Sequence, residues 1–213
     1  MNKFIMLITL TVLLLAFVSG CDDDPTTIQV LKYSAVDEHV FVVTDNPVLR
    51  VESFVGSISV QTGAQDTIRV VATRKAEREQ DLSEIDITMV SNPNELDIKA
   101  EQPTGVENVE AHFDITVPAG TRVELTSGVG SILYRGRPRD LNRFDVGVGS
   151  ITLYLPSNVN VSVDLTVGVG SINSAFIIEG QATTSAVTGT IGNGNDGEIR
   201  ASSGVGSIDL FRQ

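Results

Sequence analysis

The pentapeptide Gly-Val-Gly-Ser-Ile recurs four times in this chain, and its spacing restricts the folds that the chain can adopt. The copies occupy 128–132, 147–151, 168–172 and 204–208, and shorter versions stand at 55–58 and 188–191. The second glycines, from Gly130 through Gly189 to Gly206, are 19, 21, 19 and 17 residues apart. A unit of this length that repeats along a chain is typical of solenoids, in which each unit packs only on its neighbours.

Alternating branched residues around each motif indicate strands that bend at the Gly-Ser step. Before the motif the pattern has period 2, as in Val161, Val163 and Leu165, and after it the alternation resumes out of phase. Val and Ile three positions apart cannot face the same side of one straight strand, so the chain must bend where glycine permits it. The sequence therefore predicts an all-β fold, a β-solenoid built from strand–corner–strand units of about 19 residues.

Six glycines are predicted to form the structural corners of this single-stranded, β-helix-like stack: Gly56, Gly130, Gly149, Gly170, Gly189 and Gly206. Stacking in chain order would place the valines before the corners in one inward ladder and the isoleucines after them in another. The valine ladder would contain Val55, Val129, Val148, Val169 and Val205. Ile151 would lie in the middle of the stack and Ile208 in its last unit. The final strand would then leave an unpaired edge, which predicts self-association as one outcome.

The N-terminus predicts export and a lipid anchor. Lys3, an apolar run from Phe4 to Val18 and the small residues that follow describe a signal peptide over 1–20. The run is too short to favour a permanent membrane span. Val-Ser-Gly-Cys resembles the bacterial lipobox, after which Cys21, the only cysteine, becomes the lipid-bearing first residue. A plain signal peptide followed by an incidental cysteine is the alternative.

The predicted location is the bacterial cell envelope, and the charge of the chain excludes nucleic acid as a partner. Removal of 1–20 takes away Lys3 alone and leaves 14 basic against 27 acidic side chains, a net charge of −13. Nucleic acid and anionic lipid both require a basic face, so the expected membrane contact is the lipid on Cys21. A flexible acidic tether occupies 21–34, and 35–213 form the β-solenoid domain. Which membrane carries the protein is left open.

Within this domain, three features carry a resemblance to a known family. They are the segment from Val48 to Ala76 with Gly-Ser-Ile at 56–58, the segment from Phe113 to Gly120, and the repeated Gly-Ser-Ile steps. Together they resemble the bacterial "putative adhesin" family over 36–213. Its members are envelope proteins with a β-solenoid domain, so the resemblance implies that fold here. Many members have Gly-Asp-Ile at the corner, and the serine of this chain leaves such a corner intact.

No residue pattern predicts a catalytic residue, a metal site or a cofactor. His39 and His112 are the only histidines, and no serine stands in a nucleophile elbow. The segment 192–197 is similar to calcium-binding turns of β-rolls, but such sites need aspartates from successive coils. Only this coil has one, so a simple Gly/Asn turn is preferred.

One basic segment interrupts the acidic chain. Its four arginines are Arg135, Arg137, Arg139 and Arg143. Guanidinium groups suit carboxylates and phosphates, so one interpretation is an anion-binding patch for an anionic glycan or a lipid headgroup. The other is a solvated loop that neutralises nearby acids.

These features favour a lipid-anchored envelope protein that is not an enzyme and acts as an adhesin-like binding or scaffolding module. A self-assembling structural component of the envelope is the alternative. A carbohydrate-active enzyme on a β-solenoid fits less well, because the exposed corner positions are serines, which do no acid–base work. The identity of a protein or glycan partner is left open.

The lipid anchor gives the first testable prediction. Cys21→Ser removes the thiol that would carry the diacylglycerol, so the variant should accumulate as precursor or be released from the membrane. Metabolic labelling with a tagged fatty acid, followed by membrane fractionation, measures this. Labelling of the variant at the wild-type level would contradict the lipoprotein prediction.

Overall fold

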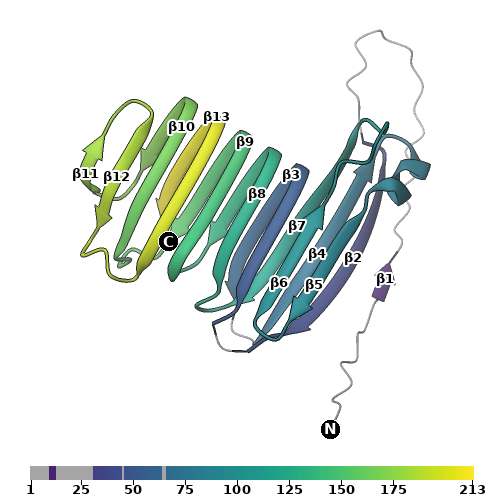
Figure 1. The fold of residues 1–213 in the computed structure, drawn as a ribbon, viewed down its shortest axis with the longest axis horizontal. Helices are drawn as coiled ribbons and strands as arrows, with labels where there is room; N and C mark the ends of the chain where they lie inside the picture. Colours follow the sequence, from purple (N-terminus) through teal and green to yellow (C-terminus); the bar gives the residue numbers. More distant parts are fainter. Residues whose placement is uncertain (1–9, 13–30, 45, 64–65) are drawn as a thin grey trace.

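A computed structural model describes residues 10–12, 31–44, 46–63 and 66–213. Cys21, most of the predicted signal peptide and most of the tether lie outside the described residues. The expectation of an all-β chain is confirmed, since every described element is a strand except the short 3-10 helix η1 (Glu79–Glu84). All strands belong to one large mixed sheet (Figure 1). Within the described part, no helix is long and apolar enough to cross a bilayer.

Five long strands carry the repeated motif and lie parallel to one another. In spatial order they are β3 (Val48–Gly63), β8 (Arg122–Arg135), β9 (Asp140–Leu155), β13 (Gly197–Arg212) and β10 (Val161–Ser174). We call them the stack and each strand a rung. Their register superimposes the motifs, so that Gly130 lies opposite both Gly56 and Gly149 and each Gly-Ser-Ile meets another.

Each rung must fold back on itself, because very few residues join its end to the start of the next. A straight strand of 14 residues, the length of β8, would be about 46 Å long. The connection from β8 to β9 is residues 136–139, which reach about 17 Å when fully extended. Since β8 and β9 are parallel and in register, the end of β8 must return to the start of β9. Four residues can span that distance only if each rung bends near its middle. The bends lie along the upper edge of the stack in Figure 1.

The core fills the space between the two halves of each rung. In β8, Val123 and Leu125 are buried before the bend and Ile132 and Tyr134 after it, with the reversed phase that the sequence predicts. Burial of the Tyr134 side chain raises the pKa of its phenol. Asn142 is also fully buried; its Oδ1 accepts a hydrogen bond from Val123 N (3.1 Å) and its Nδ2 donates to Arg139 O (2.9 Å).

The predicted order of the rungs along the stack is wrong. The C-terminal strand β13 lies between β9 and β10, not at the end, and pairs in parallel with both. Ile208 therefore has a rung on each side, opposite Ile151 and Ile172. The connection from β9 to β10 leaves a place for one strand between them in the sheet, and β13 later occupies that place. The unpaired edge predicted for the final strand is absent from β13 for the same reason.

Further strands extend the stack beyond β3, at the right in Figure 1; the two that pair with β3 run parallel to it, and those beyond them are antiparallel to their neighbours. The first half of β3 pairs with β6 (Glu95–Ala100), which forms a hairpin with β5 (Ile87–Asn92). The second half pairs with β7 (Val109–Pro118), followed outward by β4 (Thr67–Ala76), β2 (Tyr33–Val42) and β1 (Leu10–Val12). The two branches form two layers that continue the two halves of the rungs.

A small hairpin lies at the opposite end of the stack, beyond β10. It consists of β12 (Ala186–Ile191) and β11 (Glu179–Ala182). β12 pairs antiparallel with β10 only over Val161–Thr166, which is the half before the bend. Val167 N donates one further bond to Ser185 O (2.8 Å).

The corrected order predicts how core truncations rank. Ile151→Ala and Ile208→Ala should destabilise the protein equally, each by about 2–5 kcal/mol, because both side chains are 0% exposed and both rungs have two neighbours. Ile172→Ala should cost clearly less, since Ile172 is only half-buried. Urea unfolding midpoints measure the three losses. A smaller loss for Ile208→Ala than for Ile151→Ala would contradict this order.

Candidate binding surface

The bends of the rungs are built on glycines that no other residue can replace. Five of the six predicted corner glycines lie at equivalent positions with φ between 137° and 148°: Gly56, Gly130, Gly149, Gly170 and Gly206. An added Cβ at Gly149 would lie 1.6 Å from the carbonyl oxygen of Gly130 in the adjacent rung. The corresponding distances at the other four glycines are 1.7–2.1 Å. Both the left-handed backbone and the close rung contact therefore require glycine.

Residues just before the bend strengthen the contact between rungs. At the first glycine of the motif, a Cβ would lie 2.5 Å from the carbonyl oxygen of the next rung, as for Gly147 against Gly128. Buried serines next to this glycine donate hydrogen bonds to neighbouring carbonyl groups: Ser127 Oγ to Gly56 O (3.3 Å) and Ser203 Oγ to Gly149 O (3.0 Å). These hydrogen bonds add to the glycine contacts that join neighbouring rungs at the bend.

The valines of the motif lie outside the core, which corrects the prediction of an inward valine ladder. Val129 is 46% exposed, Val148 49%, Val205 48% and Val169 66%, whereas Ile132, Ile151 and Ile208 are 0% exposed. The reason is the bend itself. The inward positions on either side are taken by residues such as Val146 and Ile151, so the valine at the apex points into solvent.

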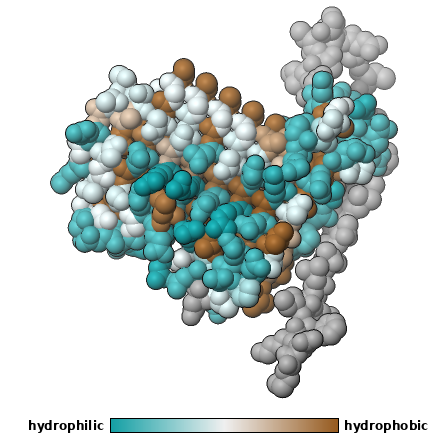
Figure 2. All heavy atoms as spheres, viewed as in Figure 1, coloured by the Kyte–Doolittle hydropathy of each residue, from teal (hydrophilic) through white to brown (hydrophobic). Residues whose placement is uncertain are grey.

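The motif valines, all exposed except the half-buried Val55, and the serines after them form a continuous ridge along the bends. In spatial order the ridge consists of Val55, Val129, Val148, Val205 and Val169, with Ser57, Ser131, Ser150, Ser207 and Ser171 beside them. At about 4.8 Å per rung, five rungs give a length of about 19 Å. Figure 2 shows a row of hydrophobic side chains along this edge of the stack.

The ridge carries no charge in a chain whose formal net charge is −12. The segments 53–58, 127–133, 146–151, 167–173 and 203–208 contain no Asp, Glu, Lys or Arg. The outer face of the first halves of the rungs differs, because Arg50 there pairs with Glu95, Asp97 and Glu124. Figure 2 shows this face as largely hydrophilic. The neutral ridge is therefore a distinct surface.

Gly189, the sixth predicted corner, departs from this pattern. It lies in β12, which is antiparallel to β10, and it faces Val163 in place of another corner glycine. Its φ is not in the positive region, and Ile191 pairs with Val161 outside the isoleucine ladder. The Thr-Gly-Thr-Ile segment therefore belongs to the end hairpin and forms no rung.

The four arginines of the basic segment each have different neighbours. The Arg135 guanidinium lies over the Tyr154 ring, with its central carbon 4.0 Å from the ring centre. Arg137 donates to Asp196 (2.6 Å), and Arg139 donates to Asn46 Oδ1. Arg143 is exposed on β9 at the register position between Glu124 and Arg200. Three of the four groups thus contact side chains of this chain, and one of these contacts, from Arg137 to Asp196, pairs an arginine with an acid.

Sequence reasoning gave His112 no partner, and the structure gives it two. His112 lies on β7 at the position that a corner serine occupies in each rung, next to Ser57. Its Nδ1 lies 2.8 Å from Ser57 Oγ and accepts from Ser57 N at 3.2 Å, while Nε2 lies 2.7 Å from Glu110 Oε2. Because Nδ1 is the acceptor, Nε2 carries the proton. His112 thus closes the serine row at one end; only the register, which sequence reasoning lacked, reveals this.

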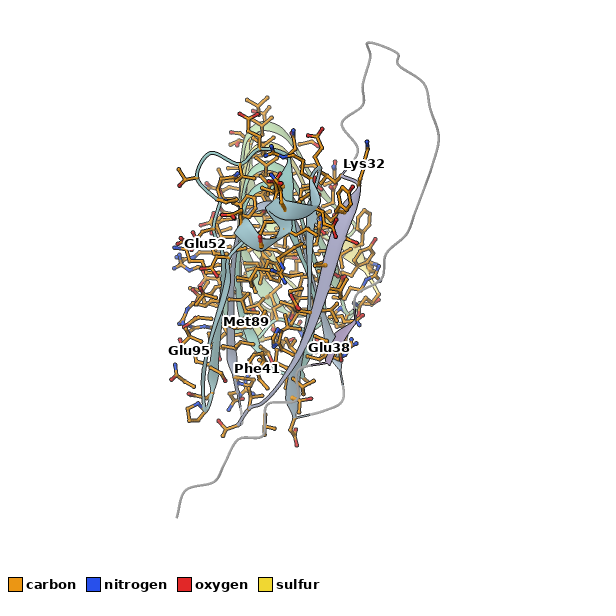
Figure 3. The ribbon with its side chains drawn as sticks, turned by 90° about the vertical axis from the view of Figure 1, so that its right-hand side faces the viewer. Lys32, Glu38, Phe41, Glu52, Met89 and Glu95 are labelled. Carbon is orange, nitrogen blue, oxygen red and sulfur yellow. The ribbon has the colours of Figure 1, made fainter. Side chains whose placement is uncertain are left out.

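A hollow of about 530 Å³ lies between the two layers at the β2 end of the molecule. Phe41 of β2 and Met89 of β5 line it from opposite sides, and Figure 3 looks onto this end. Its polar side contains the ion pair between Arg74 and Asp37 (2.5 Å). Nearby on β2, a hydrogen bond from Arg69 lowers the pKa of the Glu38 carboxyl. The described residues include no group of His, Cys, Asp and Glu placed to hold a metal ion.

The glycine contacts at the bend predict a large difference between two Gly→Ala variants. Gly149 and Gly105 both have positive φ, but an added Cβ at Gly105 meets nothing within 4 Å. Gly105→Ala should therefore cost only about 1–2 kcal/mol of backbone strain. Gly149→Ala adds a clash with the Gly130 carbonyl and should prevent folding or lower stability by more than twice that amount. Thermal unfolding of both variants measures the difference, and equal losses would disprove the close rung contact.

Comparison with known proteins shows a related fold. No known sequence family matches the chain, and no curated protein is similar to it in sequence. Among solved structures, a putative cell adhesion protein from Clostridium sporogenes matches with a TM-score of 0.53 and 16% identity, over 83% of this chain and 99% of that chain. A putative adhesin from Bacteroides fragilis matches with a TM-score of 0.31 and 11% identity, over 82% and 96%. The first match establishes that this chain has a fold similar to that of a bacterial putative cell adhesion protein.

Proposed function

We propose that this protein is a lipid-anchored component of the bacterial cell envelope, in which a β-solenoid domain acts as an adhesin-like binding or scaffolding module without enzymatic activity. The lipid on Cys21 holds the chain at a membrane, and the tether places the domain beyond the membrane surface. The domain binds a protein or glycan partner through its ridge.

Three observations support the solenoid. Parallel rungs superimpose their motifs residue by residue, connections as short as 136–139 join successive rungs, and the core lies between the two halves of each rung. The resulting domain is rigid along its length, because each bend is locked to its neighbour by glycine contacts. A rigid, elongated domain suits a module that holds a binding surface at a fixed distance from a membrane.

The ridge is the single observation that carries the binding function. Monomeric soluble proteins rarely expose contiguous apolar surface without a use for it. Here four valines between 46% and 66% exposed stand in register on an uncharged strip. The neighbouring hydroxyl groups add hydrogen-bonding positions at the same repeat. Such a strip fits a flat or extended partner, a protein surface or a glycan chain, better than a small molecule.

Self-assembly and carbohydrate-active catalysis, the two alternative functions, would use this surface differently. A self-assembling envelope component would use the same domain to bind further copies of the chain. A carbohydrate-active enzyme would need acid–base groups on the ridge, and Ser57 with His112 and Glu110 is the one such group described there. Ser57 is half-buried, and its backbone N–H donates a hydrogen bond to His112 Nδ1. That N–H is therefore not available to bind a substrate.

Val148→Lys tests the ridge. A lysine in the middle of the strip places a charge where a partner must desolvate the surface, so adhesion of cells that display the full chain should fall at least tenfold. Val90→Lys is the matched control, because Val90 on β5 is 51% exposed and lies off the ridge. Adhesion to protein-coated and glycan-coated surfaces, with equal surface amounts of each variant, measures the effect. Equal adhesion of wild type and Val148→Lys would rule out the ridge as the binding surface.

A further inference from the structure

The last rung of the stack has an open edge on one side of its bend. β10 pairs with β13 along its whole length, from Val161 to Ser174. On its other side β12 covers only Val161–Thr166, and Val167 N adds one bond to Ser185 O. Among the described residues, 168–174 have no strand on that side. This segment contains the complete motif of the rung.

Exposure confirms that a neighbour is lacking there. Val169 is 66% exposed, against 46–49% for Val129, Val148 and Val205 in rungs with two neighbours. Ile172 is half-buried, while the equivalent Ile151 is 0% exposed. Gly170, Ser171, Asn173 and Ser174 are all exposed as well. The row of motif valines and the row of motif isoleucines both end at β10, with no further rung beside them among the described residues.

The open edge lacks the features that usually protect such an edge. Natural edge strands are commonly guarded by charged side chains, by proline or by a bulge that turns them away. The segment 165–178 contains no Asp, Glu, Lys, Arg or Pro. Asn173 Nδ2 donates within the same surface, to Ser171 Oγ (3.4 Å) and Asp209 Oδ1 (2.7 Å). The edge is therefore open to pairing with another strand.

The bend restricts which strand can pair with this edge. At each of the four contacts between rungs, a Cβ at the corner would lie 1.6–1.9 Å from the neighbouring carbonyl oxygen. A strand that follows β10 around its bend must therefore have glycine at the corner. Gly-Val-Gly-Ser-Ile of this same chain meets that requirement. Among the described residues of each copy, β3, β8, β9 and β13 already have neighbours on both sides, and β10 is the rung with a free side at its motif.

We propose that two copies of this chain pair through residues 168–172 of β10, the part of the open edge that is symmetric about Gly170 and free of β12. Because the same edge meets itself, the pair has twofold symmetry and the two strands run antiparallel, with the axis at Gly170. Rotation about an axis through the corner places the half before the bend of one copy against the half after the bend of the other. The two bends then coincide, and the ridge continues from one copy into the next. This proposal needs neither the lipid anchor nor an adhesive function.

Cross-linking of the full-length chain in its own membrane tests the pairing. From strand spacing and rise, the two Ser171 residues would lie about 8 Å apart across the axis, within reach of a short bifunctional maleimide. Ser171→Cys should therefore give a covalent dimer. Ser131→Cys is the matched control, at the same ridge position of an inner rung, and it also reports any background from Cys21. Its dimer yield should be at least tenfold lower.

Lysine variants in the Ser171→Cys background locate the interface. Val169→Lys puts a charge on the open edge and should reduce the dimer at least tenfold, whereas Val148→Lys, in the ridge but away from the edge, should leave it unchanged. Equal yields from Ser171→Cys and Ser131→Cys would overturn the proposal, as would a dimer insensitive to Val169→Lys. Cross-linked species larger than a dimer, or of two different chains, would also overturn it. Loss of adhesion in Val148→Lys with the dimer intact separates this proposal from the adhesive function.

Discussion

The fold depends on the contact between the Cα of each corner glycine and the carbonyl oxygen of the adjacent rung. At Gly149 a single added carbon would lie 1.6 Å from that oxygen. With no side chain at the corner, the rungs approach to ordinary strand spacing even where the backbone reverses, so the ladder of parallel pairs continues around the bend. The core then follows, because register at the corner brings each buried isoleucine against the isoleucine of the next rung. Every other packing feature of the stack is a consequence of this register.

The same contact produces the ridge. A residue between two glycines at a tight bend has no inward position, so Val148 must point out while Val146 and Ile151 point in. The repetition that builds the core therefore also repeats an apolar group on the surface at every rung. Serine next to it is small enough to leave the corner undisturbed, and His112 can replace it only at the end of the row, where Glu110 is available to accept its second hydrogen bond. Core stability and the candidate binding surface thus come from one motif.

Local geometry was predictable from the sequence, while solvent exposure at the bend and non-local order were not. Alternation and the phase change at Gly-Ser predicted strands that bend at glycine and the burial of Ile132, Ile151 and Ile208. Extrapolating period 2 through the corner wrongly placed Val129 and its equivalents inside, because the rule holds for straight strands. Gly189 shared the motif only in outline, and nothing local distinguishes a Thr-Gly-Thr-Ile hairpin strand from a rung. Ser57 and His112 are 55 residues apart and meet only through the pairing of β3 with β7.

The order of the rungs could not be read from the motifs because the motifs are nearly identical. Val-Gly-Val-Gly-Ser-Ile at 146–151 and Ser-Gly-Val-Gly-Ser-Ile at 203–208 present almost the same backbone and side chains to a neighbour, so either fits beside 167–172. The connecting segments decide the order: the chain passes over one position between β9 and β10, and the hairpin of β11 and β12 returns it to fill that position with β13. A motif that fits beside any copy of itself cannot distinguish a rung of its own chain from a rung of another. The interchangeability that hides the order in the sequence is therefore also the physical reason why the last rung, left open beyond Val167, is suited to a second copy.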